Sequence, residues 1–175
     1  MVGGQVYVNC QTILPDFTQT SGIVLVNSSA DFQGVQGYKN WFYGQYFANQ
    51  SGNFTQLPTW TGFVWQDAQS FNTPFLDANG GHPGVDDLKW AVRRWVSIYS
   101  GNATISGDFY DRNTGCGDGA HVRIFQNGVQ VYEYLNIPGS STLYSFPLTL
   151  AIGDQIDFAI DPKFDAGCDD THFTA

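Results

Sequence analysis

Residues that commonly fill helices are scarce in this chain of 175 residues. Glutamate occurs once, at Glu133, and there are three lysines, whereas aspartate occurs 15 times. Charged residues make up 13% of the sequence, against the ~25% that is typical of globular domains. Because glutamate, lysine, leucine and alanine are the residues that helices favour, this shortage argues against a helical protein.

Basic residues and long apolar runs are scarce as well. The sequence has seven basic residues (lysine and arginine) and 16 acidic ones, which gives a net charge of -9. Nucleic-acid binding that ignores sequence needs a basic surface, so we expect no such partner. No apolar run approaches the ~20 residues of a membrane-spanning helix, so we expect no membrane span. The start of the chain, residues 1–4, has neither the basic stretch nor the apolar run of a signal peptide.

Aromatic and turn-forming residues are abundant instead. Phe, Tyr and Trp make up 16% of the chain, and there are 20 glycines. So many aromatics argue against disorder. The length suits one domain with a core of its own, spanning residues 1–175, in which residues 1–30 form an N-terminal extension or an extra strand. The composition therefore predicts a single all-β, acidic globule.

Short strands separated by turn clusters predict the architecture. The strongest local signal is Asn127-Gly128 between two alternating runs, a dipeptide typical of tight β-hairpins. Residues 67–87 are expected to form a long packed connection, and a helix remains the alternative for residues 88–99. The pattern predicts an antiparallel β-sandwich of jelly-roll type. The expected strands cover residues 5–9, 22–26, 40–47, 61–66, 88–99, 104–110, 121–126, 129–134, 142–150, 156–160 and 171–175.

Three cysteines, Cys10, Cys116 and Cys168, allow one disulfide. We expect Cys116 to pair with Cys168, because both lie in loops rich in glycine and aspartate, and Cys10 to be free or bonded to another chain. Three unpaired thiols in a reducing compartment are the alternative. A disulfide and four glycosylation sequons favour a secreted or extracellular location, although the sequons also suit turns. The sequon asparagines are Asn27, Asn49, Asn53 and Asn102.

Several motifs resemble those of a bacterial secreted β-sandwich module. Residues 36–44 read QGYKNWFYG and resemble its QG-x-x-x-W-x-YG opening, and residues 91–95 read AVRRW and resemble one of its strands. A GDG, the NG hairpin, the segment GDQIDF and a closing DDT follow in matching order at residues 117–171. The resemblance covers about residues 31–175 and implies a jelly-roll domain of the carbohydrate-binding kind.

Carbohydrate binding without catalysis is the first functional hypothesis, with a polysaccharide or glycan as the partner. Sugars present apolar C–H faces that stack on aromatic rings, while polar groups fix their orientation. The alternative for each ring is a place in the core. The candidate ligand-binding residues are Trp41, Tyr43, Trp60, Trp65 and Tyr99.

A calcium ion is the cofactor that the sequence suggests. Aspartates gather in the two glycine-rich loops that carry Cys116 and Cys168, and hard oxygen ligands in flexible loops suit Ca²⁺. The spacing is not that of an EF-hand, and solvated turn aspartates are the alternative. The candidate metal ligands are Asp108, Asp111, Asn113, Asp118, Asp169 and Asp170, with Asp165 close by in the second loop.

Two further hypotheses remain. The chain is a structural subunit of an extracellular layer or filament that self-associates by β-strand addition, or it is a jelly-roll polysaccharide hydrolase or lyase. No common catalytic motif supports the second, and catalysis is not expected. Arg93 and Arg94 point to opposite faces of a strand, and we expect at least one to form a structural ion pair, with Asp157 or Asp118.

Overall fold

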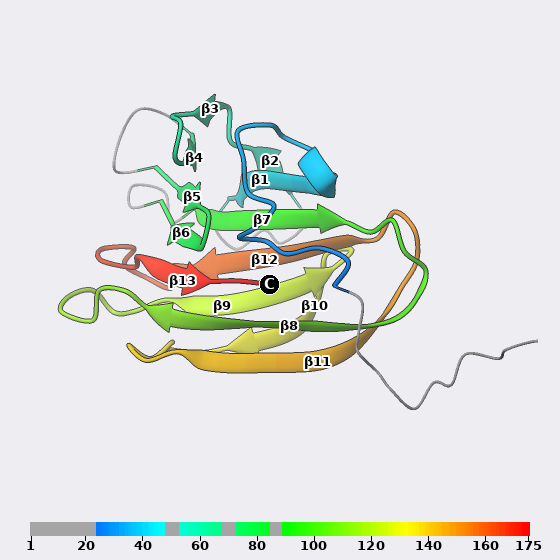
Figure 1. Cartoon of the computed structure of the whole chain (residues 1–175). Coiled ribbons are helices and arrows are strands. Elements are labelled where there is room, and N and C mark those ends of the chain that lie inside the picture. The colour runs from blue at the N-terminus through cyan, green and yellow to red at the C-terminus, as the bar shows by residue number, and fades with distance from the viewer. Residues whose placement is uncertain (1–23, 48–52, 68–72, 85–88) are drawn as a thin grey trace, which may run out of the picture.

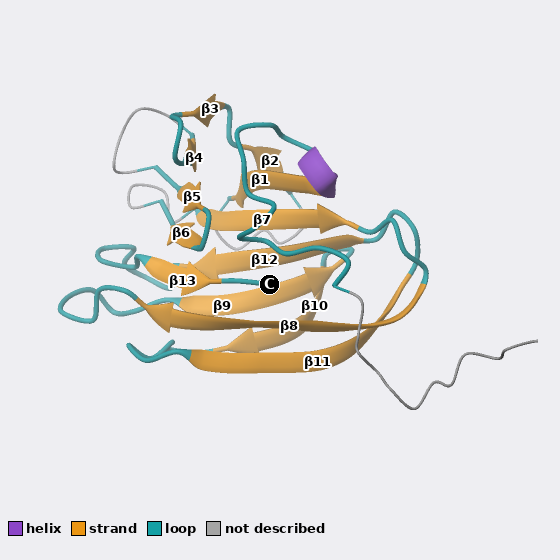
Figure 2. Cartoon of the chain, viewed as in Figure 1, coloured by secondary structure: helices purple, strands orange, loops and turns teal. Residues whose placement is uncertain are grey.

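The computed structural model describes residues 24–47, 53–67, 73–84 and 89–175 and shows two antiparallel sheets packed as a sandwich (Figures 1 and 2). The predicted all-β sandwich is confirmed, and the jelly-roll type remains a prediction. The one helix among these residues is the 3₁₀ turn η1, Tyr38–Asn40. No helix in the described ranges has the length and apolar character needed to cross a membrane. Predictions for residues 5–9, Cys10 and Asn49 lie outside the described residues.

The two sheets differ in how long their strands are. Sheet A has six strands and sheet B has seven, of which β3 to β6 are two or three residues long. In spatial order, sheet A consists of β10 (Val129–Tyr134), β9 (His121–Gln126), β12 (Gln155–Asp161), β7 (Trp90–Val96), β1 (Trp41–Tyr46) and β2 (Thr55–Gln56). Sheet B consists of β11 (Thr142–Leu150), β8 (Gly101–Asp111), β13 (Thr171–Phe173), β6 (Gly80–His82), β5 (Phe75–Asp77), β4 (Trp65–Gln66) and β3 (Thr59–Trp60).

Strands with clear alternation lie where the sequence predicts them. The β9–β10 hairpin turns at Asn127 and Gly128, whose φ angles of 52° and 79° fit the left-handed turn that this dipeptide favours. Residues 88–99 contain the strand β7 rather than the alternative helix. The predicted strand at 22–26 is different, because its described residues, 24–26, form no strand.

The expected long connection at residues 67–87 instead contains β5 and β6. Gly80 is the reason that β6 can reach β13, since a Cβ atom there would lie 1.9 Å from the carbonyl oxygen of Thr171. Leu76 of β5 is 2% exposed, so this segment packs into the sandwich as expected. Strands of three residues carry too little alternation to be recognised in the sequence.

Aromatic rings dominate the core between the sheets. Trp41, Tyr43 and Trp95 point inward from sheet A and are 3% exposed or less. Phe109, Tyr144 and Phe173 meet them from sheet B, and Phe109 and Phe173 pack edge to face at 6.4 Å. Composition alone does not tell whether an aromatic ring is buried or exposed, and the structure shows that many of these rings fill the interior.

Arg93 and Arg94 leave β7 on opposite sides, as alternation requires. The Arg94 guanidinium donates to both carboxylate oxygens of the fully buried Asp157, at 2.6 and 2.8 Å, and the Tyr46 hydroxyl also donates to Asp157. The expected ion pair is thus confirmed for Arg94. The buried Arg93 is held differently, because its guanidinium donates to the carbonyl oxygen of Asp77 at 2.7 Å.

Chain crossings between the sheets are tied together at both ends of the sandwich. At one end, a disulfide joins Cys116 in the β8–β9 crossing to Cys168 in the β12–β13 crossing, as predicted. At the other end, Ser97 follows β7 and Gly153 precedes β12. There the amide of Gly153 donates to the Ser97 carbonyl at 2.7 Å, and the Ser97 amide donates to the Asp154 carbonyl at 2.8 Å. The two ends therefore differ in the kind of bond that holds them.

Candidate functional site

The aromatics predicted to bind sugar do not form a common surface. Trp41 and Tyr43 are each 1% exposed and Trp65 is 6% exposed, so these three rings belong to the core. Trp60 is half-buried and packs on Trp65 with ring centroids 5.5 Å apart. Tyr99 is 36% exposed, but it lies in the β7–β8 crossing, apart from the others. The packing of the sandwich explains the difference, because rings at inward positions of β1 must fill its interior.

The outer face of sheet B brings together another set of aromatic and polar side chains. Side chains alternate along β8, so Ser106, Asp108 and Tyr110 share the face opposite to the buried Phe109. The register places Leu143 of β11 beside Asp108 and His172 of β13 beside Tyr110. We call this set, continued by the neighbouring strands β6 and β5, the sheet B strip: Ser106, Asp108, Tyr110, Leu143, Ser145, His172, His82 and Phe75.

Two stacked ring pairs lie along this strip. Tyr110 and His172 stack with ring centroids 4.5 Å apart and an interplanar angle of 14°. Phe75 and His82 stack at 5.7 Å and 16°. All four side chains are half-buried, so each pair is supported by the sheet and still reaches solvent.

Asp108 is held rigidly at the centre of the strip. One of its carboxylate oxygens accepts hydrogen bonds from the Thr174 hydroxyl at 2.5 Å and contacts His172 Nε2 at 3.1 Å. The other oxygen accepts from the Ser141 hydroxyl at 2.9 Å. Burial alone would raise the pKa of Asp108, but these hydrogen bonds outweigh it and hold the pKa below its usual range. The carboxylate is therefore a fixed, charged acceptor.

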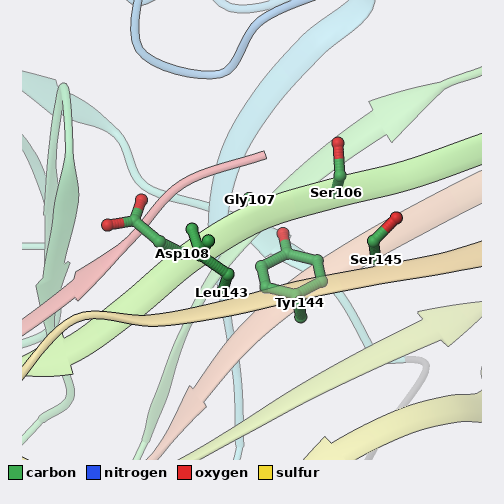
Figure 3. Close-up of a pocket in the computed structure, with 6 residues that line it drawn as sticks. All are labelled: Ser106, Gly107, Asp108, Leu143, Tyr144 and Ser145. Carbon is green, nitrogen blue, oxygen red and sulfur yellow. The ribbon is translucent and has the colours of Figure 1, made fainter.

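A shallow hollow of about 490 Å³ opens beside Asp108 on the face of β8 and β11. Figure 3 shows Asp108 and Leu143 on one side of it and the hydroxyls of Ser106 and Ser145 on the other. Leu143 is 82% exposed, and Gly107 and Tyr144 complete the lining. The hollow thus combines an apolar wall with hydroxyl and carboxylate groups.

The predicted metal ligands separate into four places. Asp108 belongs to the sheet B strip, and Asp170 lies 3.2 Å from the Arg112 guanidinium, which also binds Asp77 at 2.6 Å. The exposed Asn113 contacts Cys116 Sγ through its side-chain oxygen at 3.9 Å. The negative charges of Asp111, Asp118 and Asp165 lie close enough to Asp169 to raise its pKa. We call this set the Asp169 cluster: Asp111, Asp118, Asp165 and Asp169.

Asp169 is the unusual member of that cluster. It is 1% exposed, and within the described residues neither carboxylate oxygen has a hydrogen-bond partner. Burial raises the pKa of Asp169 to about 7, and the negative charges of Asp118, Asp111 and Asp165 add to the rise. In the described ranges, no three His, Cys, Asp or Glu side chains are grouped so that they could hold a metal ion.

The sequon asparagines that the structure describes are all exposed. Asn27 uses its side-chain oxygen to accept the amides of Ser29 and Ala30, at 3.0 and 2.8 Å, so it also shapes a turn. Asn53 and Asn102 lie at exposed positions beside or within strands β2 and β8. Glycosylation at these positions remains a prediction.

Comparison of the chain with models of known protein families, with curated proteins and with solved structures finds no match. Of the resemblance to a secreted module, the structure confirms the two-sheet antiparallel sandwich.

Proposed function

We propose that this domain binds carbohydrate without catalysis, in an extracellular setting, through the sheet B strip. The observation that supports this most directly is the run of stacked rings and fixed polar groups across neighbouring strands: Tyr110 on His172, Phe75 on His82, and the anchored Asp108 between Tyr110 and the hollow. The disulfide favours the extracellular location, because such bonds persist in oxidising compartments.

The chemistry of the strip matches that of a sugar ring. The apolar face of a sugar packs on aromatic rings, and its hydroxyls need acceptors and donors at fixed positions. Tyr110 and Phe75 offer the rings, Asp108 offers a charged acceptor, and Ser106 and Ser145 offer hydroxyls that accept or donate. An extended strip along several strands suits a chain of sugar units better than a single one.

The enzyme hypothesis has less support from the same residues. Glycoside hydrolysis usually needs two carboxyl groups that flank the scissile bond, and the sheet B strip contains one, Asp108, which is already engaged by Ser141 and Thr174. The lone glutamate, Glu133, is bound to Arg123 at 2.6 Å. These contacts favour binding over bond cleavage.

Self-association by strand addition also has less support at β11, the longest edge strand among the described residues. The pairing of β11 with β8 continues without a shift through Pro147. Proline has no N–H to donate, so its position in an unbroken ladder is one at which the N–H of another residue would point away from β8, toward the outer side of this edge strand. Proline at that position interrupts the row of donors that an added strand needs. A size measurement of the purified protein separates the two hypotheses: polymers support assembly, and a monomer that binds sugar supports the strip.

The test is calorimetric titration of the full chain with a panel of soluble polysaccharides. We expect binding to at least one of them, and we expect Tyr110→Ala to weaken it about tenfold, which corresponds to about 1.4 kcal/mol. The matched control is Tyr99→Ala, which deletes a tyrosine ring at the opposite end of the sandwich. We expect this variant to bind with the affinity of the wild type. Circular dichroism verifies that both variants are folded.

Three results would overturn the proposal. The first is the absence of binding across the panel, and the second is equal binding by wild type and Tyr110→Ala. The third is the release of reducing sugar from a bound polysaccharide, which would show that the domain is an enzyme.

A further inference from the structure

The disulfide-linked end of the sandwich contains a buried carboxyl group to which no described residue is hydrogen-bonded. Asp169 is 1% exposed and both of its carboxylate oxygens lack hydrogen-bond partners among the described residues. An isolated buried carboxylate costs several kcal/mol unless it is paired, protonated or bound to a metal. The chain therefore places an unpaired carboxyl group beside the point where it joins two loops covalently.

The surroundings of Asp169 add negative charge and main-chain oxygens. Asp111 and Asp165 each use one carboxylate oxygen for a nearby amide, that of Asn113 at 2.7 Å and that of Gly167 at 2.8 Å. The Asp169 carboxylate faces Gly117, whose Cβ position lies 3.5 Å from Asp169 Oδ1 and 1.9 Å from the carbonyl oxygen of Gly167. A side chain at Gly117 would close the space above the carboxylate.

One cation of the protein reaches the edge of this cluster. The Lys163 ammonium donates to the carbonyl oxygen of Asp118 and lies 3.9 Å from Asp118 Oδ2. The cluster has four carboxylates, so one ammonium leaves most of its charge uncompensated. Arg112 is engaged by Asp77 and Asp170 and is not bonded to Asp169.

We propose that Asp169 is the buried anchor of a calcium site between the disulfide-linked loops, to which Asp111, Asp118 and Asp165 contribute negative charge. Because no three carboxylates of the described residues are grouped so that they could hold a metal ion by themselves, backbone carbonyls and water supply most of the ligands. Calcium accepts six to eight oxygen ligands in flexible geometry, whereas Mg²⁺ requires a near-ideal octahedron. The chemistry of this site therefore favours calcium. The inference is independent of sugar binding, because Asp169 is not part of the sheet B strip.

The test compares Asp169→Asn with Asp170→Asn in the full chain. Both variants remove one negative charge from adjacent positions of the same loop, but Asp170 is bound to Arg112. Calorimetric titration with CaCl₂ is expected to show one site in wild type and in Asp170→Asn. We expect the affinity of Asp169→Asn to fall at least tenfold, and Mg²⁺ to bind more weakly than calcium in every case.

Thermal unfolding gives a second and sharper readout. In chelator, Asp169→Asn is expected to unfold at a higher temperature than wild type, because the substitution removes the unpaired buried charge. In saturating calcium the order is expected to reverse, because only the wild type gains stability from the bound ion.

The proposal is overturned if wild type neither binds calcium nor gains stability at about 10 mM, which is about tenfold above the Kd of the weakest extracellular sites. Equal calcium affinity in Asp169→Asn and wild type would also overturn it. Failure of the sugar titration would leave this result unaffected, since the two experiments concern different residues and ligands.

Discussion

Removal of the Cys116–Cys168 disulfide is expected to lower the stability of the domain strongly. The two cysteines are 52 residues apart in the sequence, so their bond closes a long loop. In the chain-entropy model, a loop of this length lowers the entropy of the unfolded chain by about 14 cal/mol/K, which corresponds to about 4 kcal/mol at 25 °C. With an unfolding entropy of about 0.37 kcal/mol/K for a chain of this size, the expected fall in Tm is about 11 °C.

Urea unfolding of the Cys116→Ser/Cys168→Ser double variant measures this change in the free energy of unfolding. Each single variant is expected to lose about as much as the double variant, because either one abolishes the same bond. Reductant is expected to destabilise the wild type by a similar amount and to leave the double variant unchanged. Cys10→Ser, which removes a thiol that this bond does not use, is the control. A loss below about 1 kcal/mol in the double variant would refute the reasoning.

Two further predictions concern the buried carboxylates Asp157 and Asp31. Asp157→Ala is expected to lower the free energy of unfolding in urea by about 3–5 kcal/mol, because it leaves the Arg94 guanidinium without its partner. The double variant Arg94→Met/Asp157→Leu is expected to recover much of that loss. Equal losses in both variants would contradict this account. Burial alone would raise the pKa of Asp31, but the Asn27 amide and the Lys39 ammonium outweigh burial and lower it. Because the folded-state pKa is lower than the unfolded one, Asp31 contributes stability that is present above about pH 4 and is lost as the pH falls below that value. Unfolding experiments from pH 6 to pH 2 are expected to show a smaller loss of stability in Asp31→Asn than in wild type, and parallel curves would be evidence against this role for Asp31.

Local sequence signals predicted the second half of the fold well. The strands β9, β10 and β11 begin and end where the alternation of residues 121–150 and the Asn127-Gly128 turn place them. The disulfide was also predictable, because both cysteines lie in loops of the same unusual composition. These features depend on short stretches of chain, which a sequence displays directly.

Features that depend on distant pairing could not be predicted in the same way. Alternation shows that Trp41 and Tyr43 share one face of a strand, but not whether that face is inside or outside. The sheet B strip depends on β13 lying between β8 and β6, which brings His172 beside Tyr110 from 62 positions away in the sequence. Even so, the spacing of Asp108 and Tyr110 within one strand was a signal that they share a face.

The order in which the sandwich opens follows from the unequal ties at its two ends. The crossings that contain Cys116 and Cys168 are joined by a covalent bond, whereas those that contain Ser97 and Gly153 are joined by backbone hydrogen bonds. Local opening transitions break hydrogen bonds but leave disulfides intact. Among the amides at these crossings, hydrogen–deuterium exchange is therefore expected to begin at Ser97 and Gly153. The two sheets are expected to separate first at that end, while the disulfide still holds the other end together.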